Sequence, residues 1–230
     1  MRRAQAERAM TTAGREQTGA KGERTQRQII EGALRALQAG GVATTTTRDI
    51  AAGAGVSLST LHYHFESKSA LLLAVLEHLI AETTAALREE AGESANIAGC
   101  IRDCLRAGWR FLTRTLHLQI VQYELTLYAL RREDAAGLAA YQYDAYVKLY
   151  QMILQGVAAR TGELDAAGSA DVARFMLAGI DGILLQELAK PNKDRSSRGI
   201  ETLIAATQAF AAGLSEVHQK PKKKKRGTMR

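Results

Sequence analysis

The residues from Leu58 to His64 carry side chains that suit contact with nucleic acid. The hydroxyls of Ser59 and Thr60 are followed by the imidazoles of His62 and His64 and the phenol of Tyr63. Such groups can reach phosphate oxygens and base edges in a major groove. A segment this short takes its position from the elements on either side of it.

The stretch from Thr46 to Lys68 predicts two short helices joined by a tight turn. Thr46 can cap the first helix, with Asp49 in the reciprocal capping position three residues later. Gly55 stands where the turn needs a positive φ, and Ser57 can cap the second helix, Leu58–His64. The side chains that we expect on the inner faces are Ile50, Ala51, Ala54, Val56 and Leu61. This is helix-turn-helix spacing, although a small helical corner with a polar outer face could share it.

The same stretch resembles the DNA-binding signature of the tetracycline-repressor (TetR) family of bacterial regulators. The matching residues are Thr46, Arg48, Asp49, Ile50, Ala51, Ala54, Gly55, Val56, Ser57, Thr60, Leu61, His64, Phe65, Ser67 and Lys68. One departure is His62, where the family usually has Tyr. The close match extends from about Arg24 to Leu76, and the rest of the chain agrees in length and helical layout.

This resemblance implies a set of residues in contact with DNA. They are Thr47, Arg48, Ser57, Leu58, Ser59, Thr60, His62, Tyr63, His64 and Lys68. We expect Thr47, Tyr63, His64 and Lys68 mainly on phosphates. We expect Arg48, Ser59, Thr60 and His62 closer to the bases.

The charge is unevenly distributed along the 230 residues, whose net charge is +7. Residues 1–70 carry 10 Lys/Arg against 6 Asp/Glu, and residues 220–230 carry 7 Lys/Arg and no acid. Residues 71–219 carry 14 Lys/Arg against 18 Asp/Glu. A basic head suits phosphate neutralisation, whereas an acidic body does not suit lying on DNA.

Composition favours helix throughout, since the chain has 2 Pro and is rich in Ala and Leu. We therefore predict an all-α protein with a three-helix DNA-binding domain over residues 23–70 and a ligand-binding and dimerisation domain over 71–219. Residues 1–22 are expected to form a disordered basic arm, and 220–230 a disordered basic tail. The tail resembles a nuclear-import signal, as an engineered addition would, but a native basic tail would look the same.

The last two predicted helices, over residues 169–190 and 196–218, are apolar on more than one side. Small residues such as Ala178, Gly179 and Gly182 permit a close approach of helices. A helix that is apolar all round must be covered on all sides. We predict a homodimer in which two copies of this pair form a four-helix interface, with a monomer that buries the pair internally as the alternative.

A ligand site is suggested less directly, by aromatic residues and by two carboxylates in apolar helices. The family resemblance implies a body domain that receives a small molecule between helices. On that reading the ligand-binding residues are Trp109, Leu112, Tyr123, Glu124, Tyr146, Phe175 and Asp181. The alternative is that these aromatic residues belong to the core, which is the commoner role for aromatics at helical spacing.

The predicted function is a cytoplasmic repressor that binds a palindromic operator in double-stranded DNA as a homodimer and is released by a small-molecule effector. The alternative is an effector-independent regulator or activator with the same reading head. No nucleophile–base pair, phosphate loop or metal cluster is visible, so we expect no enzyme activity, no cofactor and no metal. Cys100 and Cys104 are expected to be reduced thiols, with a redox sensor as the alternative. No run of eighteen apolar residues is present, so no membrane partner is expected.

Overall fold

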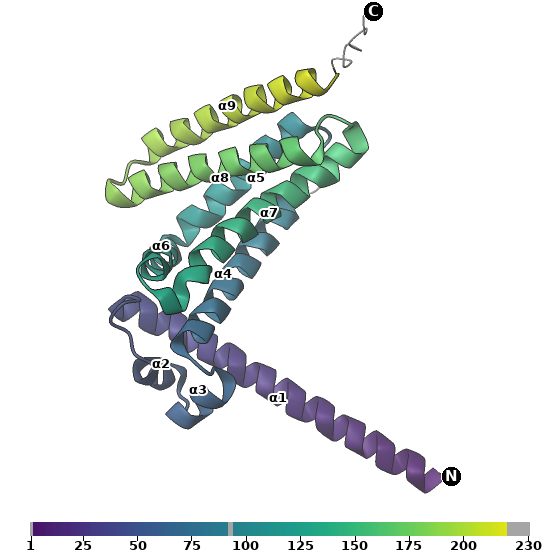
Figure 1. The fold of residues 1–230 in the computed structure, drawn as a ribbon, viewed down its shortest axis with the longest axis vertical. Coiled ribbons are helices and arrows are strands. Elements are labelled where there is room, and N and C mark those ends of the chain that lie inside the picture. Colours follow the sequence, from purple (N-terminus) through teal and green to yellow (C-terminus); the bar gives the residue numbers. More distant parts are fainter. Residues whose placement is uncertain (1, 92–93, 220–230) are drawn as a thin grey trace, which may run out of the picture. The chain divides into compact units, whose positions relative to one another are not determined.

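The computed structural model describes residues 2–91 and 94–219, and over these residues it contains helices and no strands (Figure 1). This confirms the predicted all-α fold class. The chain divides into two compact units. The first comprises the residues up to Leu79 together with His117–Ala140, and the second comprises Ile80–Leu116 and the residues from Tyr141 onward. The body domain predicted over 71–219 therefore contributes residues 117–140 to the same unit as the predicted reading head.

The first unit is built around the predicted helix-turn-helix. Its helices are α1 (Arg2–Gly40), α2 (Thr47–Ala54), α3 (Leu58–His64), the first half of α4 (Lys68–Ala91), most of α6 (Leu116–Leu130), the 3-10 turn η1 (Glu133–Ala135) and the start of α7 (Ala136–Thr161). The buried core of this unit includes Ile29, Ala33, Leu37, Ile50, Leu61, Leu71, Leu72 and Val75. Each of α1, α2, α3 and α4 thus contributes buried apolar side chains to this unit.

The prediction of a disordered arm over residues 1–22 is wrong for the part that the structure describes, because α1 begins at Arg2 (Figure 1). The sequence there is rich in Ala, Arg, Glu and Gln and contains no Pro. These are strong helix formers, and they allow α1 to continue backward from its packed half without a break. The prediction of a disordered tail concerns residues 220–230, which lie outside the described residues.

Helix α4 contains a segment that we did not predict from the sequence. Over Lys68–Glu89 it is long and apolar enough to cross a membrane, judged by length and composition. Part of this segment is nevertheless buried, since Leu71, Leu72 and Leu87 are completely buried within the two units. A helix that faces a protein core also needs an apolar composition, so this composition alone does not indicate a membrane span.

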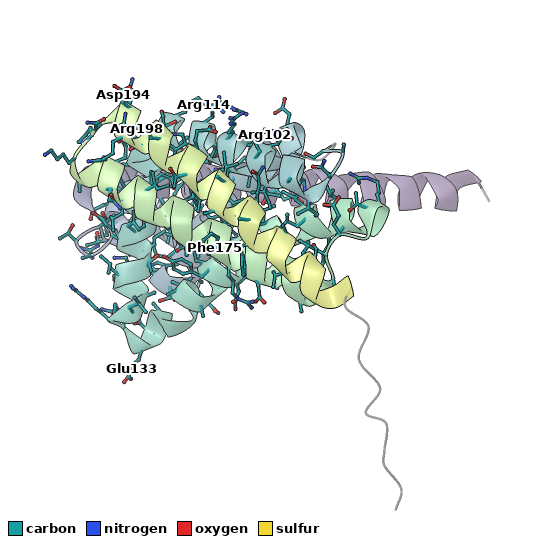
Figure 2. The ribbon with its side chains drawn as sticks, turned by 90° about the horizontal axis from the view of Figure 1, so that it is seen from above. Arg102, Arg114, Glu133, Phe175, Asp194 and Arg198 are labelled. Carbon is teal, nitrogen blue, oxygen red and sulfur yellow. The ribbon has the colours of Figure 1, made fainter. Side chains whose placement is uncertain are left out.

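The second unit contains α5 (Ile97–Arg114), α8 (Ala166–Ala189), α9 (Lys193–Gln219) and the remaining parts of α4 and α7. Helices α8 and α9 lie side by side (Figures 1 and 2). A Cβ atom on Gly179 of α8 would lie 2.3 Å from Leu203 of α9, which shows how closely this pair packs. Cys100 and Cys104 form no disulfide and are buried in the core of this unit.

A close approach between α1 and α2 fixes the first unit, and substitution at Gly32 tests it. A Cβ atom there would lie 2.5 Å from Cα and Cβ of Ala54, so the α2 backbone would have to move. We expect Gly32→Ala to lower the free energy of unfolding by ~2 kcal/mol, as overpacking does. Urea denaturation followed by circular dichroism measures this.

The matched control is Gly22→Ala in the same helix, where no atom lies within 4 Å of the added Cβ. We expect this variant to be as stable as the wild type or to gain up to about 1 kcal/mol from better helix propensity. Equal stabilities for the Gly32 and Gly22 variants would contradict the close packing of α1 on α2.

Candidate nucleic-acid interface

The turn between α2 and α3 has the geometry that the sequence predicted. Gly55 ends α2 in the left-handed region, with φ of 65° and ψ of 31°. Its N–H donates to the carbonyl of Ala52, and the N–H of Val56 donates to that of Ala51 at 3.0 Å. The turn therefore satisfies the last carbonyls of α2 while it redirects the chain into α3.

Side-chain caps fix where both short helices begin. The N–H of Thr46 donates to Oδ2 of Asp49 at 2.8 Å, and the N–H of Asp49 donates to Oγ1 of Thr46 at 3.3 Å. The hydrogen bonds from Thr46 lower the pKa of Asp49, which keeps this capping box ionised. At α3, Oγ of Ser57 accepts the N–H of Thr60 at 3.0 Å. Both predicted caps are confirmed.

Helix α3 separates its apolar side from its polar side. Leu61 is fully buried, whereas the Tyr63 side chain is 85% exposed and the neighbouring Ser59 and His62 are also exposed. The Tyr63 and His64 rings meet edge to face, with centroids 5.3 Å apart. The remaining predicted contact residues of this segment, Ser57, Leu58 and Thr60, are exposed or half-buried. The outer side of α3 therefore offers hydroxyl, phenol and imidazole groups to a partner.

The hydroxyl groups at the start of α3 form a cluster. Oγ of Ser57 lies 2.8 Å from both Oγ of Ser59 and Oγ1 of Thr60. At the start of α2, Arg48 is exposed and Thr47 is half-buried. The start of each short helix thus presents polar side chains, as expected for residues that would contact phosphates or bases.

Lys68 has a role that the sequence did not predict. Its ammonium donates to the carbonyl of Val42 at 3.0 Å and to that of Thr45 at 2.6 Å. It also lies 5.3 Å from the centre of the Tyr128 ring. Burial, with the positive charge of Arg132 nearby, lowers the pKa of Lys68. Two of its three N–H groups therefore hold the turn between α1 and α2, rather than facing outward toward a phosphate.

The predicted ligand-binding residues fall in different places. Tyr123 and Glu124 belong to the first unit, while the others belong to the second. Oε2 of Glu124 accepts the N–H of Val42 at 2.8 Å, so a backbone partner explains this carboxylate. Phe175 is 41% exposed, and its ring centroid lies 5.5 Å from that of Phe210 on α9. Phe175 thus lies on an outer face of α8 and α9 (Figure 2) and does not line a closed cavity.

The other predicted ligand residues lie in or beside the core of the second unit. Tyr146 is buried in that core, and Trp109 and Leu112 pack against it half-buried. Asp181 of α8 bonds to Tyr143 of α7, and burial raises its pKa to about 6 although the Tyr143 bond acts in the opposite direction. Tyr143 could not be predicted as its partner from the sequence, because the two residues lie on separate helices.

A cavity of about 330 Å³ in the second unit contains one predicted residue, Trp109. Its other lining residues are Thr113, Leu116, Glu187, Lys193 and Ser197. Glu187 was missed, although it is a carboxylate in an apolar helix, which is the signal that singled out Asp181. Among the described residues, no three His, Cys, Asp or Glu side chains gather in a way that could hold a metal ion.

Comparison with known protein families gives two matches, which together span most of the chain. The family of bacterial regulatory proteins called tetR matches residues 29–75, and the tetracyclin repressor-like C-terminal domain matches residues 93–209. The second match alone covers more than half of the chain. The matched ranges include the helix-turn-helix, the helices from α5 to α8 and most of α9.

Individual relatives are regulators of transcription. The HTH-type nicotine-responsive transcriptional repressor HdnoR of Paenarthrobacter nicotinovorans is 25% identical over 181 residues, covering 79% of this chain and 92% of the relative. The HTH-type transcriptional regulator TtgR of Pseudomonas putida is 29% identical over 182 residues, covering 76% and 85%. The crystal structure of a transcriptional regulator from Pseudomonas aeruginosa PAO1 shares the fold, with a TM-score of 0.67 at 18% identity, over 85% of this chain and 94% of that one.

The raised pKa of Asp181 predicts a pH-dependent contribution to stability. A carboxyl with a folded-state pKa of about 6 and an ordinary value of 3.8 holds its proton more tightly in the folded protein. Its contribution to stability is therefore complete below pH 3.8 and is lost as the pH rises through 6. We expect Asp181→Asn to gain about 2 kcal/mol relative to the wild type between pH 4.5 and pH 7.5, measured by urea denaturation at both values.

Asp171→Asn is the matched control, because it removes a carboxyl from the same helix where 57% of the side chain is exposed. We expect its stability relative to the wild type to change by less than about 0.5 kcal/mol between the two pH values. A flat difference for Asp181→Asn as well would contradict the burial of an ionisable carboxyl at this position.

Proposed function

We propose that this chain, which belongs to the TetR family of bacterial regulatory proteins, is a repressor that binds a palindromic operator as a homodimer and is released by a small-molecule effector. Its relatives are transcriptional regulators rather than enzymes. Regulators of this family are soluble cytoplasmic DNA-binding proteins, and on that ground we place the chain in the cytoplasm.

The observation that carries the proposal is the outer side of α3. It presents Tyr63, which is 85% exposed, beside exposed Ser59 and His62, while Leu61 anchors the inner side. Phenol, hydroxyl and imidazole groups can form hydrogen bonds with phosphates and base edges. In a helix-turn-helix, the second helix enters the major groove, and here that helix is α3.

The homodimer is supported by apolar side chains exposed on α8 and α9. Phe175 and Leu185 of α8 are 41% and 55% exposed, and Phe210 of α9 is 38% exposed. The exposed Ala178 and Gly182 would let another helix approach α8 closely. A second copy placed by two-fold symmetry would cover the same residues on both chains and form the four-helix interface. The same two-fold symmetry would place one α3 helix on each half of a palindromic operator.

Release by an effector is supported by the polar groups within the body. Half-buried Asp181 is hydrogen-bonded to Tyr143, and the cavity beside Trp109 has the size of a small organic molecule. The relative HdnoR is described as nicotine-responsive. An effector that prefers the state with low DNA affinity weakens DNA binding, and DNA weakens effector binding by the same factor.

Replacing two residues of α3 tests the reading head. We expect Tyr63→Ala with His64→Ala to lose at least tenfold in operator affinity, because both side chains are expected on phosphates. The operator is first selected from random duplexes with the full chain. Fluorescence anisotropy then gives the affinity. Non-specific competitor DNA is added because the 7 cations of residues 220–230 attract any polyanion. The variant should elute as a dimer, and unchanged operator affinity would refute the assignment of α3.

A charge on the outer face of α8 tests the dimer. We expect Phe175→Arg to convert the protein to a folded monomer at micromolar concentration, because an unpaired guanidinium in an apolar interface is costly. Light scattering coupled to size-exclusion chromatography measures the mass. Met152→Arg, which changes a 42% exposed apolar side chain on α7, is the control and should stay dimeric. A dimeric Phe175→Arg protein would remove this face from the interface.

A further inference from the structure

The turn between α1 and α2 is held by hydrogen bonds from three helices. On the α1 side, the N–H of Gly41 donates to the carbonyl of Leu37 at 2.8 Å. On the α4 side, the ammonium of Lys68 donates to the carbonyls of Val42 and Thr45. On the α6 side, Oε2 of Glu124 accepts the N–H of Val42 at 2.8 Å. All of these residues lie in the first unit.

The contact with Glu124 links residues that are far apart in the sequence. Val42 is 1% exposed, so its N–H needs a partner inside the protein, and α1 has already ended. The carboxylate fits closely, because a Cβ atom on Gly41 would lie 3.3 Å from Oε2 of Glu124. Gly41 also has a φ of 78°, which a side chain would strain.

Side chains are not closely packed between α6 and the turn beside this hydrogen bond. A cleft of about 360 Å³ opens beside it, lined by residues 40–44 of the turn and by Glu124, Leu127, Tyr128, Arg131 and Arg132 of α6 and its end. Leu127 remains 54% exposed. Polar links therefore carry much of the connection between α6 and the turn. The Tyr128 ring of α6 also lies 5.3 Å from the ammonium of Lys68 in α4, which itself donates to the turn.

The turn leads directly into the helix-turn-helix. Thr45 accepts from Lys68 through its carbonyl, and the next residue, Thr46, is the cap at which α2 begins. A shift of the turn would move this cap, and with it the start of α2 and the α3 helix that follows. Contacts of a reading head tolerate little displacement, since hydrogen bonds weaken steeply when distance and angle change.

We propose that Glu124 is a positioning residue for DNA binding: through the N–H of Val42 it fixes the turn from which α2 and α3 are built. Glu124 thus acts on DNA affinity without touching DNA. This role differs from ligand binding, and it rests on the proposed function of α3 as the reading helix.

Three substitutions at Glu124 separate the contact from the charge. Glu124→Gln removes the charge but keeps an oxygen at the same distance, which can still accept the N–H of Val42. Glu124→Asp keeps the charge but withdraws the carboxylate by one methylene, so the contact is lost. Glu124→Ala removes both. Glu133→Ala is the matched control, because it removes an exposed carboxylate from η1 in the same unit (Figure 2).

Two measurements are made on the full chain. Hydrogen exchange of the Val42 amide reports on the contact itself, and anisotropy with the selected operator reports on DNA affinity. We expect Glu124→Asp and Glu124→Ala to exchange Val42 faster and to bind the operator about tenfold more weakly, which is the effect of losing one hydrogen bond to a charged group. Glu124→Gln should stay within about threefold of the wild type, and Glu133→Ala should match it.

The proposal is overturned if the Asp and Ala variants bind the operator as the wild type does. It is also overturned if the Gln and Ala variants lose affinity while the Asp variant binds as the wild type does, because charge, and not the contact, would then matter. Failure of the proposed function is a different observation, since the wild type itself would then enrich no DNA sequence. A variant that does not fold is recognised by its thermal melting curve, and the Gln–Asp comparison then decides the outcome.

Discussion

Backbone groups at the ends of short helices are the constraint on which the reading head depends. Helices α2 and α3 are so short that unsatisfied N–H and C=O groups make up much of their backbone. Thr46 and Ser57 satisfy N–H groups at the two starts, and Gly55 lets the turn satisfy the carbonyls between them. A helix of this length gains little from propensity, so its caps and its few buried side chains decide where it forms.

The sequence predicted the parts of this network that are local. The capping box of Thr46 and Asp49 joins residues three positions apart, and the left-handed turn needs only Gly55. The contact of Glu124 with Val42 and the contacts of Lys68 could not be predicted in the same way. Their partners lie 82 and 23 to 26 residues away, and neither periodicity nor propensity reports on such pairs.

The same difference between local and distant information explains which helix boundaries could be predicted and why the division into two units could not. Helix α3 begins and ends where predicted, because its cap and its apolar spacing mark it. Helix α1 extends further toward the N-terminus than predicted. The prediction of disorder there gave more weight to the many charged residues than to their high helix propensity. The grouping of residues 117–140 with the reading head agrees with the hydrogen bond between Glu124 and the α1–α2 turn, which no property of α6 alone reveals.

Three carboxylates in apolar helices differ in the partners that stabilise their charge, and the difference bears on function. Glu124 accepts a backbone N–H, and Glu187 accepts hydrogen bonds from Ser196 and from the N–H of Asn192, which lower its pKa and stabilise the turn before α9. Asp181 forms no helix cap, and its bond with Tyr143 does not offset the burial that raises its pKa. A buried acid with a raised pKa is typical of a functional site, which is why the effector proposal includes Asp181 beside the cavity at Trp109.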